Sequence, residues 1–473
     1  MHVTLSQLRD AVGGCLLTSV LPEGQAAAAL GAARVEAGDV LPGDVFWAVR
    51  GTETERAEEA RRAFAAGAAG VVIPQTSPVS PARGRWTLLT ADVEGALSKL
   101  AAWRRGQFEG TTIAVSGDDH LATAAGLIEA VIGIPTHESA DGACPHGDRG
   151  RLGLALALLN ASPNQEHLVL SARPRDAVET HQLPRLCRPN VAVLLGREGT
   201  AAYEAQAWLE ALPRDGWAVL DGDEPALRKA AAGYNARIVW VGRDADCDLS
   251  ATDLRCAAGR LQFKLHGEEI SVRVWGRHHL NAVLAAVAVG QIAGHSLRAA
   301  AEALDRFEQP AAMRQVVRRA EATWIRDEAA ACSRAALELL REAPATGRRI
   351  ALCHDLPEEE RALDRLADEL ITVGGADALV ACGPRAERFA LAARRAGMPR
   401  HAALICDEPR ETVRQLNDLL APGSVVLARG WRTAVLERVW RELERGKMQK
   451  PSTPQEPSPP RGTQRIIEAP PFA

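Results

Sequence analysis

The residues whose types could support chemistry stand in a few turns that follow apolar runs. One such turn separates TTIAVSG (111–117), which predicts a strand, from LATAAGLIEAVIG (121–133), which predicts a helix. The N-terminus of a helix attracts phosphate through its free backbone N–H groups. Asp118 and Asp119 instead place two carboxylates there, and such carboxylates cap a helix and stabilise it by roughly 0.5–2 kcal/mol. The turn is therefore interpreted as an acidic helix cap.

The other groups that could do chemistry form weaker patterns. The cluster at 221–224, Asp-Gly-Asp-Glu, follows the apolar run WAVL and predicts a loop. His278 and His279 are adjacent, so they point in different directions on a helix and do not form a metal-binding pair. Cys353 and His354 are also adjacent, which does not set a nucleophile against a base. Residue types alone assign no catalytic residue and no metal ligand.

The composition is that of an ordinary globular protein, with 47% hydrophobic and 25% charged residues, which excludes disordered and collagen-like classes. The 56 basic and 60 acidic side chains leave a net charge of -4, too balanced for nucleic-acid binding. Nine cysteines stand singly, as reduced thiols do in the cytoplasm. No signal sequence is recognised, and the apolar run 152–159 is much shorter than the ~20 residues that cross a bilayer. We expect a cytoplasmic protein without a nucleic-acid or membrane partner.

Length and element order predict a multidomain α/β chain, because 473 residues are about three times a usual domain. Apolar runs between 111 and 242 alternate with helical sequence, which is typical of a doubly wound parallel sheet. RLQFKLHGEEISVRVWG (260–276) alternates like an antiparallel hairpin. Seven prolines in 451–473 predict a disordered tail. The expected segments are 1–105, 106–310, 311–446 and a Pro-rich tail at 447–473.

Four stretches carry a resemblance to a known family. They are LPGDVFWAVRG (41–51), AFAAGAAGVVI (63–73), GRHHLNAVLAAVAV (276–289) and GSVVLARGWRTAVLERV (423–439). In this order and spacing they resemble motifs of the Mur ligases, and within that family of the MurF type, which uses ATP and Mg2+ to join D-alanyl-D-alanine to UDP-N-acetylmuramoyl-tripeptide. The resemblance implies a three-domain α/β architecture. An N-terminal UDP-sugar-binding domain would precede a doubly wound, P-loop-like central ATPase domain and a Rossmann-like C-terminal ligase domain.

The same resemblance implies that the catalytic groups are largely absent. The family's phosphate loop, Gly-Thr-Asn-Gly-Lys-Thr-Thr, corresponds to 117–123, where Leu121 replaces the phosphate-binding lysine and Ala122 a Mg2+-binding hydroxyl. Ser171 corresponds to a Mg2+-binding glutamate and Trp208 to a carbamoylated lysine. Preorganised cations and metal ligands are what stabilise a transferred phosphoryl group. The resemblance therefore predicts no catalytic residue, no metal site and a degenerate ATP site.

Several family positions nevertheless keep a matching residue. Those that would contact the nucleotide are Gly117, Thr123, His278, Asn281 and Arg314, and those of the C-terminal-domain site are Asp327, Arg429 and Arg432. Each has a structural interpretation as well: Asn281 can bond a neighbouring backbone, and Arg314 can pair with a surface carboxylate. Arg429 keeps the charge of a family lysine without its compact ammonium.

Three functions agree with these residues. The first is a monomeric MurF-like protein of peptidoglycan precursor synthesis in which amide-bond formation is impaired or lost, a pseudoenzyme. The second is a non-catalytic binding or scaffolding protein of the cell-wall pathway, which would hold UDP-muramoyl-peptide or another cell-wall ligase. The third is an active ligase with a rearranged nucleotide site, which requires a cation such as Arg429 to reach the Gly117 turn.

Overall fold

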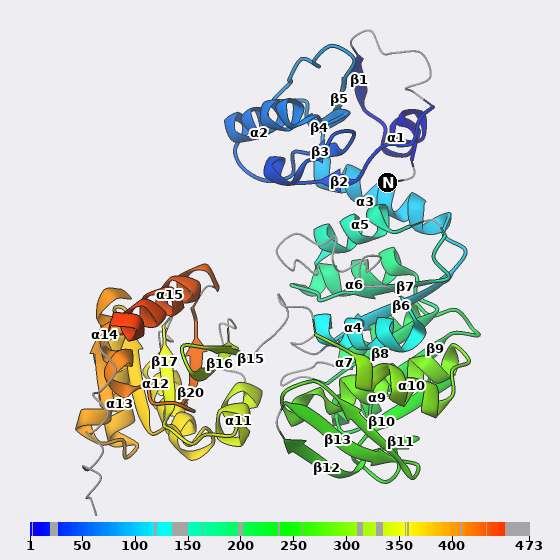
Figure 1. The fold of residues 1–473 in the computed structure, drawn as a ribbon. Coiled ribbons are helices and arrows are strands. Elements are labelled where there is room, and N and C mark those ends of the chain that lie inside the picture. Colours follow the sequence, from blue (N-terminus) through cyan, green and yellow to red (C-terminus); the bar gives the residue numbers. More distant parts are fainter. Residues whose placement is uncertain are drawn as a thin grey trace, which may run out of the picture. The chain divides into compact units, whose positions relative to one another are not determined.

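The computed structural model describes most of the chain (Figure 1). The described residues are 1, 3–18, 27–117, 121–134, 150–162, 164–196, 202–234, 237–257, 259–309, 316–327, 334–354, 356, 359–406, 409–431 and 433–449. The chain forms two compact units, Met1–Gln315 and Val316–Ala473. The finer boundaries at 105/106 and 310/311 stay predictions. In the described part, no helix combines the length and the apolar character that a membrane span requires.

The first unit begins with a five-stranded sheet in the order β1-β5-β4-β3-β2. Its elements are α1 (Leu5–Val12), β1 (Cys15–Thr18), β2 (Ala33–Arg34), η1 (Ala37–Asp39), β3 (Val45–Trp47), α2 (Glu53–Ala66), β4 (Gly70–Pro74), β5 (Trp86–Thr90) and α3 (Val93–Gly106). All neighbouring strands are parallel except β1 and β5. Thr52 and Glu55 begin α2 with a capping box, which satisfies two free N–H groups of its first turn. A strand, a helix and a strand thus follow one another over 45–74.

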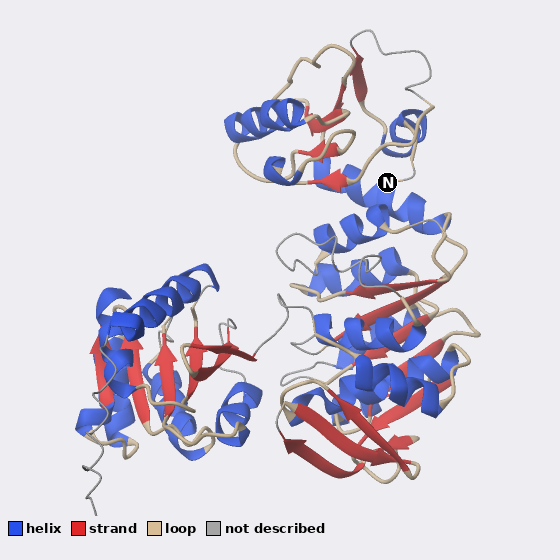
Figure 2. Ribbon diagram, viewed as in Figure 1, coloured by secondary structure: helices blue, strands red, loops and turns tan. Residues whose placement is uncertain are grey.

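The central sheet has six parallel strands in the order β11-β10-β9-β8-β6-β7. Its elements are β6 (Thr111–Ser116), α4 (Leu121–Ile132), α5 (Arg151–Asn160), β7 (His167–Ser171), α6 (Ala177–Cys187), β8 (Val191–Leu194), α7 (Ala202–Glu210), β9 (Trp217–Asp221), α8 (Pro225–Ala231), β10 (Arg237–Gly242) and β11 (Leu249–Ser250). Figure 2 shows helices along the strands, and one apolar core contains α4 while another contains α5 to α8. Covering both faces explains why the strands are continuous apolar runs. The predicted doubly wound sheet is confirmed.

A small antiparallel sheet and two helices complete the first unit. Its elements are β12 (Thr252–Ala257), β13 (Arg260–Leu265), β14 (Glu268–Val272), η5 (Arg277–His279), α9 (Leu280–Ile292) and α10 (Leu297–Arg306). The predicted hairpin forms between β13 and β14. His266 and Gly267 both have positive φ, 49° and 86°, as the tight two-residue hairpin turn requires. α9 packs against α4 and against β9 and β10, and so covers one face of the central sheet.

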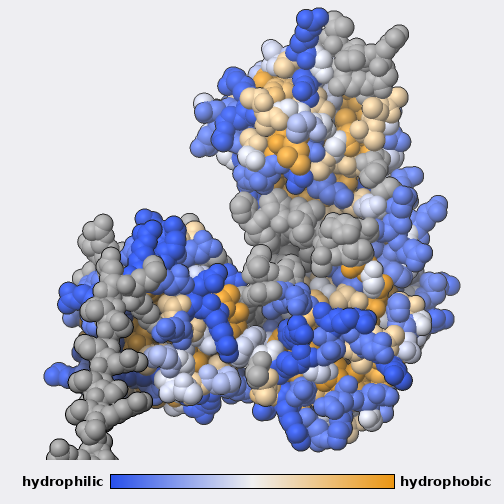
Figure 3. Space-filling view, viewed as in Figure 1, coloured by the Kyte–Doolittle hydropathy of each residue, from blue (hydrophilic) through white to orange (hydrophobic). Residues whose placement is uncertain are grey.

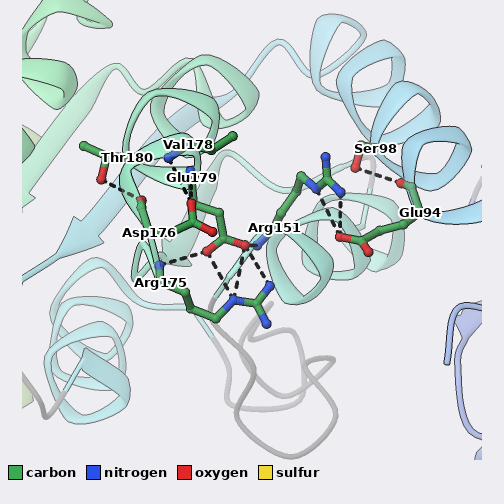
Figure 4. A network of polar contacts seen from close by, with 8 residues as sticks. All are labelled: Glu94, Ser98, Arg151, Arg175, Asp176, Val178, Glu179 and Thr180. Carbon is green, nitrogen blue, oxygen red and sulfur yellow. Dashed lines mark hydrogen bonds and ion pairs between the residues drawn. The ribbon is translucent and has the colours of Figure 1, made fainter. Parts of the chain in front are cut away.

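Polar contacts join the N-terminal sheet to the central sheet (Figure 4). Arg151, the first residue of α5, donates from Nε and Nη2 to one oxygen of Glu94 on α3, at 3.1 and 2.8 Å. Its backbone N–H donates to Glu179 on α6 at 3.2 Å. Arg175 donates from its side chain and its backbone to the same Glu179 carboxylate. Glu179 therefore fixes the start of α5 and the turn after β7 in one network.

In the Glu179→Gln variant, the free energy of unfolding of the first unit is expected to fall less between neutral and acid pH than in the wild type. Burial raises the pKa of Glu179, but hydrogen bonds from Arg175 and from the Arg151 backbone outweigh it, so the pKa lies below its ordinary 4.5. A carboxyl with a lowered folded-state pKa stabilises the fold above its unfolded pKa, and this stabilisation disappears as the pH falls through the folded pKa. Urea unfolding measured on both sides of pH 4.5 tests this. Asp10→Asn, which removes an exposed pair with Arg9, is the control, and an unchanged pH slope in Glu179→Gln would contradict the prediction.

The second unit contains a six-stranded sheet in the order β15-β16-β20-β17-β18-β19, parallel except between β15 and β16. Its elements are β15 (Val316–Arg319), β16 (Ala322–Asp327), α11 (Arg334–Glu342), β17 (Arg349–Cys353), α12 (Glu360–Thr372), β18 (Ala378–Cys382), α13 (Ala386–Arg395), η7 (Arg400–Ala402), β19 (Ala403–Cys406), α14 (Pro409–Leu419), β20 (Val425–Arg429) and α15 (Thr433–Gln449). β17, β18 and β20 coincide with the apolar runs at 349–353, 378–383 and 424–430. The tail was expected from 447, whereas α15 continues to Gln449; 450–473 lie outside the described residues.

Apolar side chains are mostly inside both units. In the view of Figure 3 the coloured surface is largely hydrophilic, with small hydrophobic areas between. Large apolar side chains that stay exposed in the described part are Leu41, Val178, Tyr203 and Leu391. They come from separate elements, and single exposed apolar residues of this kind are normal on protein surfaces.

Candidate functional site

The strand order of the central sheet brings the ends of several strands to one edge. The chain passes from β6 to β7 on one side and then to β8 on the other. Because these strands are parallel, their carboxyl ends share an edge, where Gly117, Ser171, Gly196 and Asp221 stand. Open parallel sheets bind ligands outside this edge, where the strand order reverses. We take this edge as the candidate functional site.

Gly117 ends the first of these strands for a steric reason. Its φ is 110°, in a region that favours glycine. A Cβ at this position would collide with the carbonyl oxygen of Leu195, in the segment that follows β8. Gly117 is therefore required by close backbone packing whether or not a phosphate binds. Residues 118–120 lie outside the described residues, so the acidic cap stays a prediction.

Leu121 and Thr123, in the first turn of α4, both serve the packing of the first unit. Leu121 is only 1% exposed and joins the apolar core that contains Ile113, Val115 and Leu284. Thr123 is also buried, and its hydroxyl accepts a 2.8 Å hydrogen bond from Nε2 of Gln309, which follows α10. The position of the family's lysine is thus inside the core. The retained threonine holds the end of the first unit against α4.

Ser171 and Trp208, which replace residues of the family's metal site, are also used internally. Ser171 is buried and donates from Oγ to the backbone oxygen of Leu121 at 3.5 Å, linking β7 to α4. Trp208 is 1% exposed and packs in the core on the other side of the sheet, where α7 lies against α6 and α8. Within the described residues, no group of three or more His, Cys, Asp and Glu side chains is arranged to hold a metal ion.

The carboxylates after β9 form the polar centre of this edge. Asp221 is the last residue of β9 and accepts N–H groups of Gly196 and Asp223, at 3.0 and 2.9 Å. Asp223 accepts the backbone N–H of Arg243 at 2.9 Å and the side-chain amide of Asn281 at 3.3 Å. Burial raises the pKa of Asp221 above its ordinary value, against hydrogen bonds from Asn281, Gly196 and Asp223 that act the other way. The sequence predicts only a loop here, whereas Asp221 belongs to the sheet, and Asp221 and Asp223 together join the ends of β8, β9 and β10 to α9.

A cavity of about 640 Å3 lies beside this network. Asp223, Arg243, Asp253 and Arg277 are among the residues that line it, so its walls are strongly polar. His278 and His279 lie in η5, just before α9, with their rings 4.0 Å apart and tilted by 48°. The cavity has charged groups of both signs, as a site for a polar molecule does.

The second unit has its own polar cluster at the carboxyl edge of its sheet. Asp327, Arg429 and Cys353 end three neighbouring strands, β16, β20 and β17, in register. All three are buried, with 5%, 1% and 0% exposure. Burial raises the pKa of the Cys353 thiol to about 12, Arg429 acts to lower it, and Asp327 acts to raise it. The charges of Asp327 and Arg429 therefore stand together inside the fold rather than on its surface.

Trp431 closes the same cluster. The ring of Trp431 is buried and its centre lies 5.2 Å from that of the exposed His354. A buried indole thus stands two residues after Arg429, beside the residue that follows β17.

The structure groups the predicted residues into two sets. Gly117, Thr123 and Asn281 lie in the first unit with His278, and Asp327 and Arg429 in the second; Arg314 and Arg432 lie outside the described residues. Sequence reasoning missed Gln309 as the partner of Thr123 and did not connect Asp223 with Asn281. The sequence does carry a sign of the contact between Asp223 and Asn281. Acidic residues that follow a buried parallel strand indicate the binding edge of the sheet.

Comparison with known proteins finds two kinds of UDP-N-acetylmuramoyl ligase. The chain is 27% identical over 337 residues to the UDP-N-acetylmuramoyl-tripeptide–D-alanyl-D-alanine ligases of Mycobacterium bovis and Mycobacterium tuberculosis, covering 64% of this chain and 66%, just under two thirds, of each relative. It is 25% identical over 231 residues to the UDP-N-acetylmuramate–L-alanine ligase of Chromobacterium violaceum, covering 45% of this chain and 46% of that protein. No family model matches the sequence.

Solved structures show the same fold over nearly the whole chain. MurF from Acinetobacter baumannii superposes with a TM-score of 0.74 at 20% identity, covering 94% of this chain and 99% of that one. MurF from Thermotoga maritima, in complex with ADP, superposes with a TM-score of 0.66 at 21% identity, covering 88% and 98%. The expected family and three-domain α/β architecture are therefore confirmed. Sequence relatives and fold agree, and the chain is a member of the Mur ligase family with a likeness to its MurF ligases.

Proposed function

We propose that this protein is a MurF-like member of peptidoglycan precursor synthesis in which ATP-dependent amide-bond formation is impaired or lost. The observation that carries the proposal is the position of Leu121, at the start of α4 and 1% exposed inside the apolar core. A lysine that neutralises phosphate must reach the binding edge, and this side chain goes into the protein interior instead.

The residues at this edge do not fit Mg2+ and a triphosphate. Phosphoryl transfer needs cations that neutralise the phosphate oxygens, and Mg2+ is usually held by one or two carboxylates. Leu121 and Trp208 supply only apolar surface, and the Ser171 hydroxyl is hydrogen-bonded to α4. Asp221 and Asp223 are carboxylates, but they accept backbone and amide N–H groups of their own fold. We derive no catalytic step through ATP or Mg2+.

The nucleoside part of the site is better preserved than its phosphate part. Asn281 and His278 remain beside the 640 Å3 polar cavity. We propose that any remaining nucleotide binding occurs there, depends little on the phosphates and does not require Mg2+.

A non-catalytic binding protein is the second candidate function. The loop of the LPGD motif keeps a built structure: the Asp44 carboxylate accepts the N–H groups of Ala32 and Leu41, at 2.8 and 3.1 Å, and pairs with Arg34 at 3.0 Å. A preserved N-terminal fold beside a lost phosphate site favours holding UDP-muramoyl-peptide, or another cell-wall ligase, without reaction.

The third candidate, an active ligase that uses Arg429, is less favoured. Arg429 is 1% exposed and lies in register with Asp327 at the end of β20. Delivering its guanidinium to a phosphate in the first unit would remove this charge from its buried place and leave Asp327 behind, which costs several kcal/mol.

Two assays on the purified full chain test the proposal. Incubation with ATP, Mg2+, UDP-muramoyl-tripeptide and D-alanyl-D-alanine is expected to give no ADP and no product above the protein-free control. An active MurF ligase under the same conditions is the positive control, and turnover at its rate would refute the proposal. Calorimetry with UDP-muramoyl-tripeptide alone then separates the first two candidates, because only the binding protein is expected to give heat.

A further inference from the structure

A second cavity lies at the opposite edge of the central sheet, where its strands begin. Its volume is about 210 Å3, and it lies between the starts of β6 to β9 and the end of α9. Ile113, Val191 and Val289 form apolar walls, and Trp217 adds an aromatic ring. An engineered cavity of ~150 Å3 holds a benzene molecule, so this one has room for one or two fused rings. It shares no residue with the candidate site at the carboxyl edge.

Two polar side chains on the lining have unused hydrogen-bonding capacity. The Asn190 side-chain oxygen accepts the N–H of Thr112 at 2.9 Å, which leaves its amide nitrogen as a donor. Nδ1 of His167 is buried and has no hydrogen-bond partner within the described part of the chain. Buried polar atoms in native proteins nearly always have a partner. Apolar walls with a few such groups are the usual composition of a small-molecule site.

The charges around the cavity favour a ligand that donates hydrogen bonds. Asp215 brings an exposed carboxylate to the lining. Ile292, the last residue of α9, lies there too, and the C-terminal end of a helix carries a partial negative charge. The guanidinium of Arg237 lies 5.3 Å from the centre of the Trp217 ring, and aromatic rings attract flat groups of positive character through their faces.

We propose that this cavity binds a small, flat, amino-substituted heteroaromatic molecule. Its ring would lie against Trp217, its amino group would face Asp215 and the end of α9, and a ring nitrogen would accept from Asn190. This site is independent of the phosphate edge, so it would be present whether or not the protein forms amide bonds.

Titration of the full chain with 2-aminobenzimidazole, and with benzimidazole-2-carboxylate as the matched anion, tests the proposal by calorimetry and saturation-transfer NMR. We expect the amino compound to bind at least about tenfold more tightly than the carboxylate. Ala293→Phe, which fills the cavity, is expected to weaken binding by a similar factor. Asp215→Asn, at an exposed position, should reduce the difference in affinity between the two compounds. Circular dichroism confirms that each variant is folded.

Asp253→Asn is the control, because Asp253 lines the polar cavity at the other edge. Binding should be unchanged in this variant. The proposal is overturned if the wild-type protein binds neither compound below about 1 mM, if Asp253→Asn abolishes binding, or if Ala293→Phe and Asp215→Asn both bind as the wild type does. If Ala293→Phe does not fold, the proposal is judged by the affinities of the two compounds for Asp215→Asn and for the wild type. Loss or presence of ligase turnover does not affect any of these outcomes.

Discussion

Leu121→Lys is expected to destabilise the first unit by about 3–5 kcal/mol rather than to restore ATP binding. The side chain is 1% exposed among apolar residues of β6, α4 and α9. An ammonium placed among these apolar neighbours loses its hydration, so the lysine must either lose its proton or open the core. Restoring the residue that the family uses should therefore damage the fold.

Urea unfolding followed by circular dichroism measures this effect, with ATP binding followed by calorimetry on the same protein. Leu121→Met is the matched control, because it keeps the volume and should cost less than ~1.5 kcal/mol. A stable Leu121→Lys protein that binds ATP would show that this position faces the phosphates. It would also remove the main support for the proposed loss of activity.

Arg429→Met is expected to destabilise the second unit by about 3–5 kcal/mol, because it leaves the Asp327 carboxylate buried without the neighbouring positive charge. Asp327 and Arg429 end adjacent strands in register and are 5% and 1% exposed. Methionine keeps most of the apolar length of arginine, so the loss comes from charge rather than from a large cavity.

The double variant Asp327→Leu/Arg429→Met distinguishes charge from packing. Replacing a buried pair by apolar residues of similar size is often neutral, so the double variant should recover most of the stability. The stabilities of the variants are compared by thermal unfolding of the full chain. Hydrogen exchange of the backbone amides in the strands of each unit shows which unit is affected. A double variant no more stable than Arg429→Met would mean that the two charges do not support each other.

Much of the fold follows from local pattern. Apolar runs such as 111–117 and 349–353 predict strands because both faces of a parallel sheet are covered, and they became β6 and β17. The hairpin at 260–276 was expected from alternation and formed around His266. The Pro-rich tail is expected from 447, and α15 continues to Gln449, just before the first proline of the tail.

The candidate site was predicted less completely. Gly117, Thr123 and Asn281 were selected by resemblance, and each proved to have a packing or hydrogen-bonding role. The partners Gln309 and Asp223 were not found, since they stand 186 and 58 positions away along the chain. No local pattern records a contact between residues so far apart.

The sequence by itself determined the elements, the family and the absence of a lysine at position 121, because these depend on residue types and on spacing along the chain. Only the tertiary structure decided what replaces the missing groups. Leu121 and Trp208 are core residues on opposite faces of the sheet, and Asp221 and Asp223 tie strand ends together. The reason is physical: burial and hydrogen-bond partners depend on which strands become neighbours, and the order of parallel strands in a sheet is not the order of the chain.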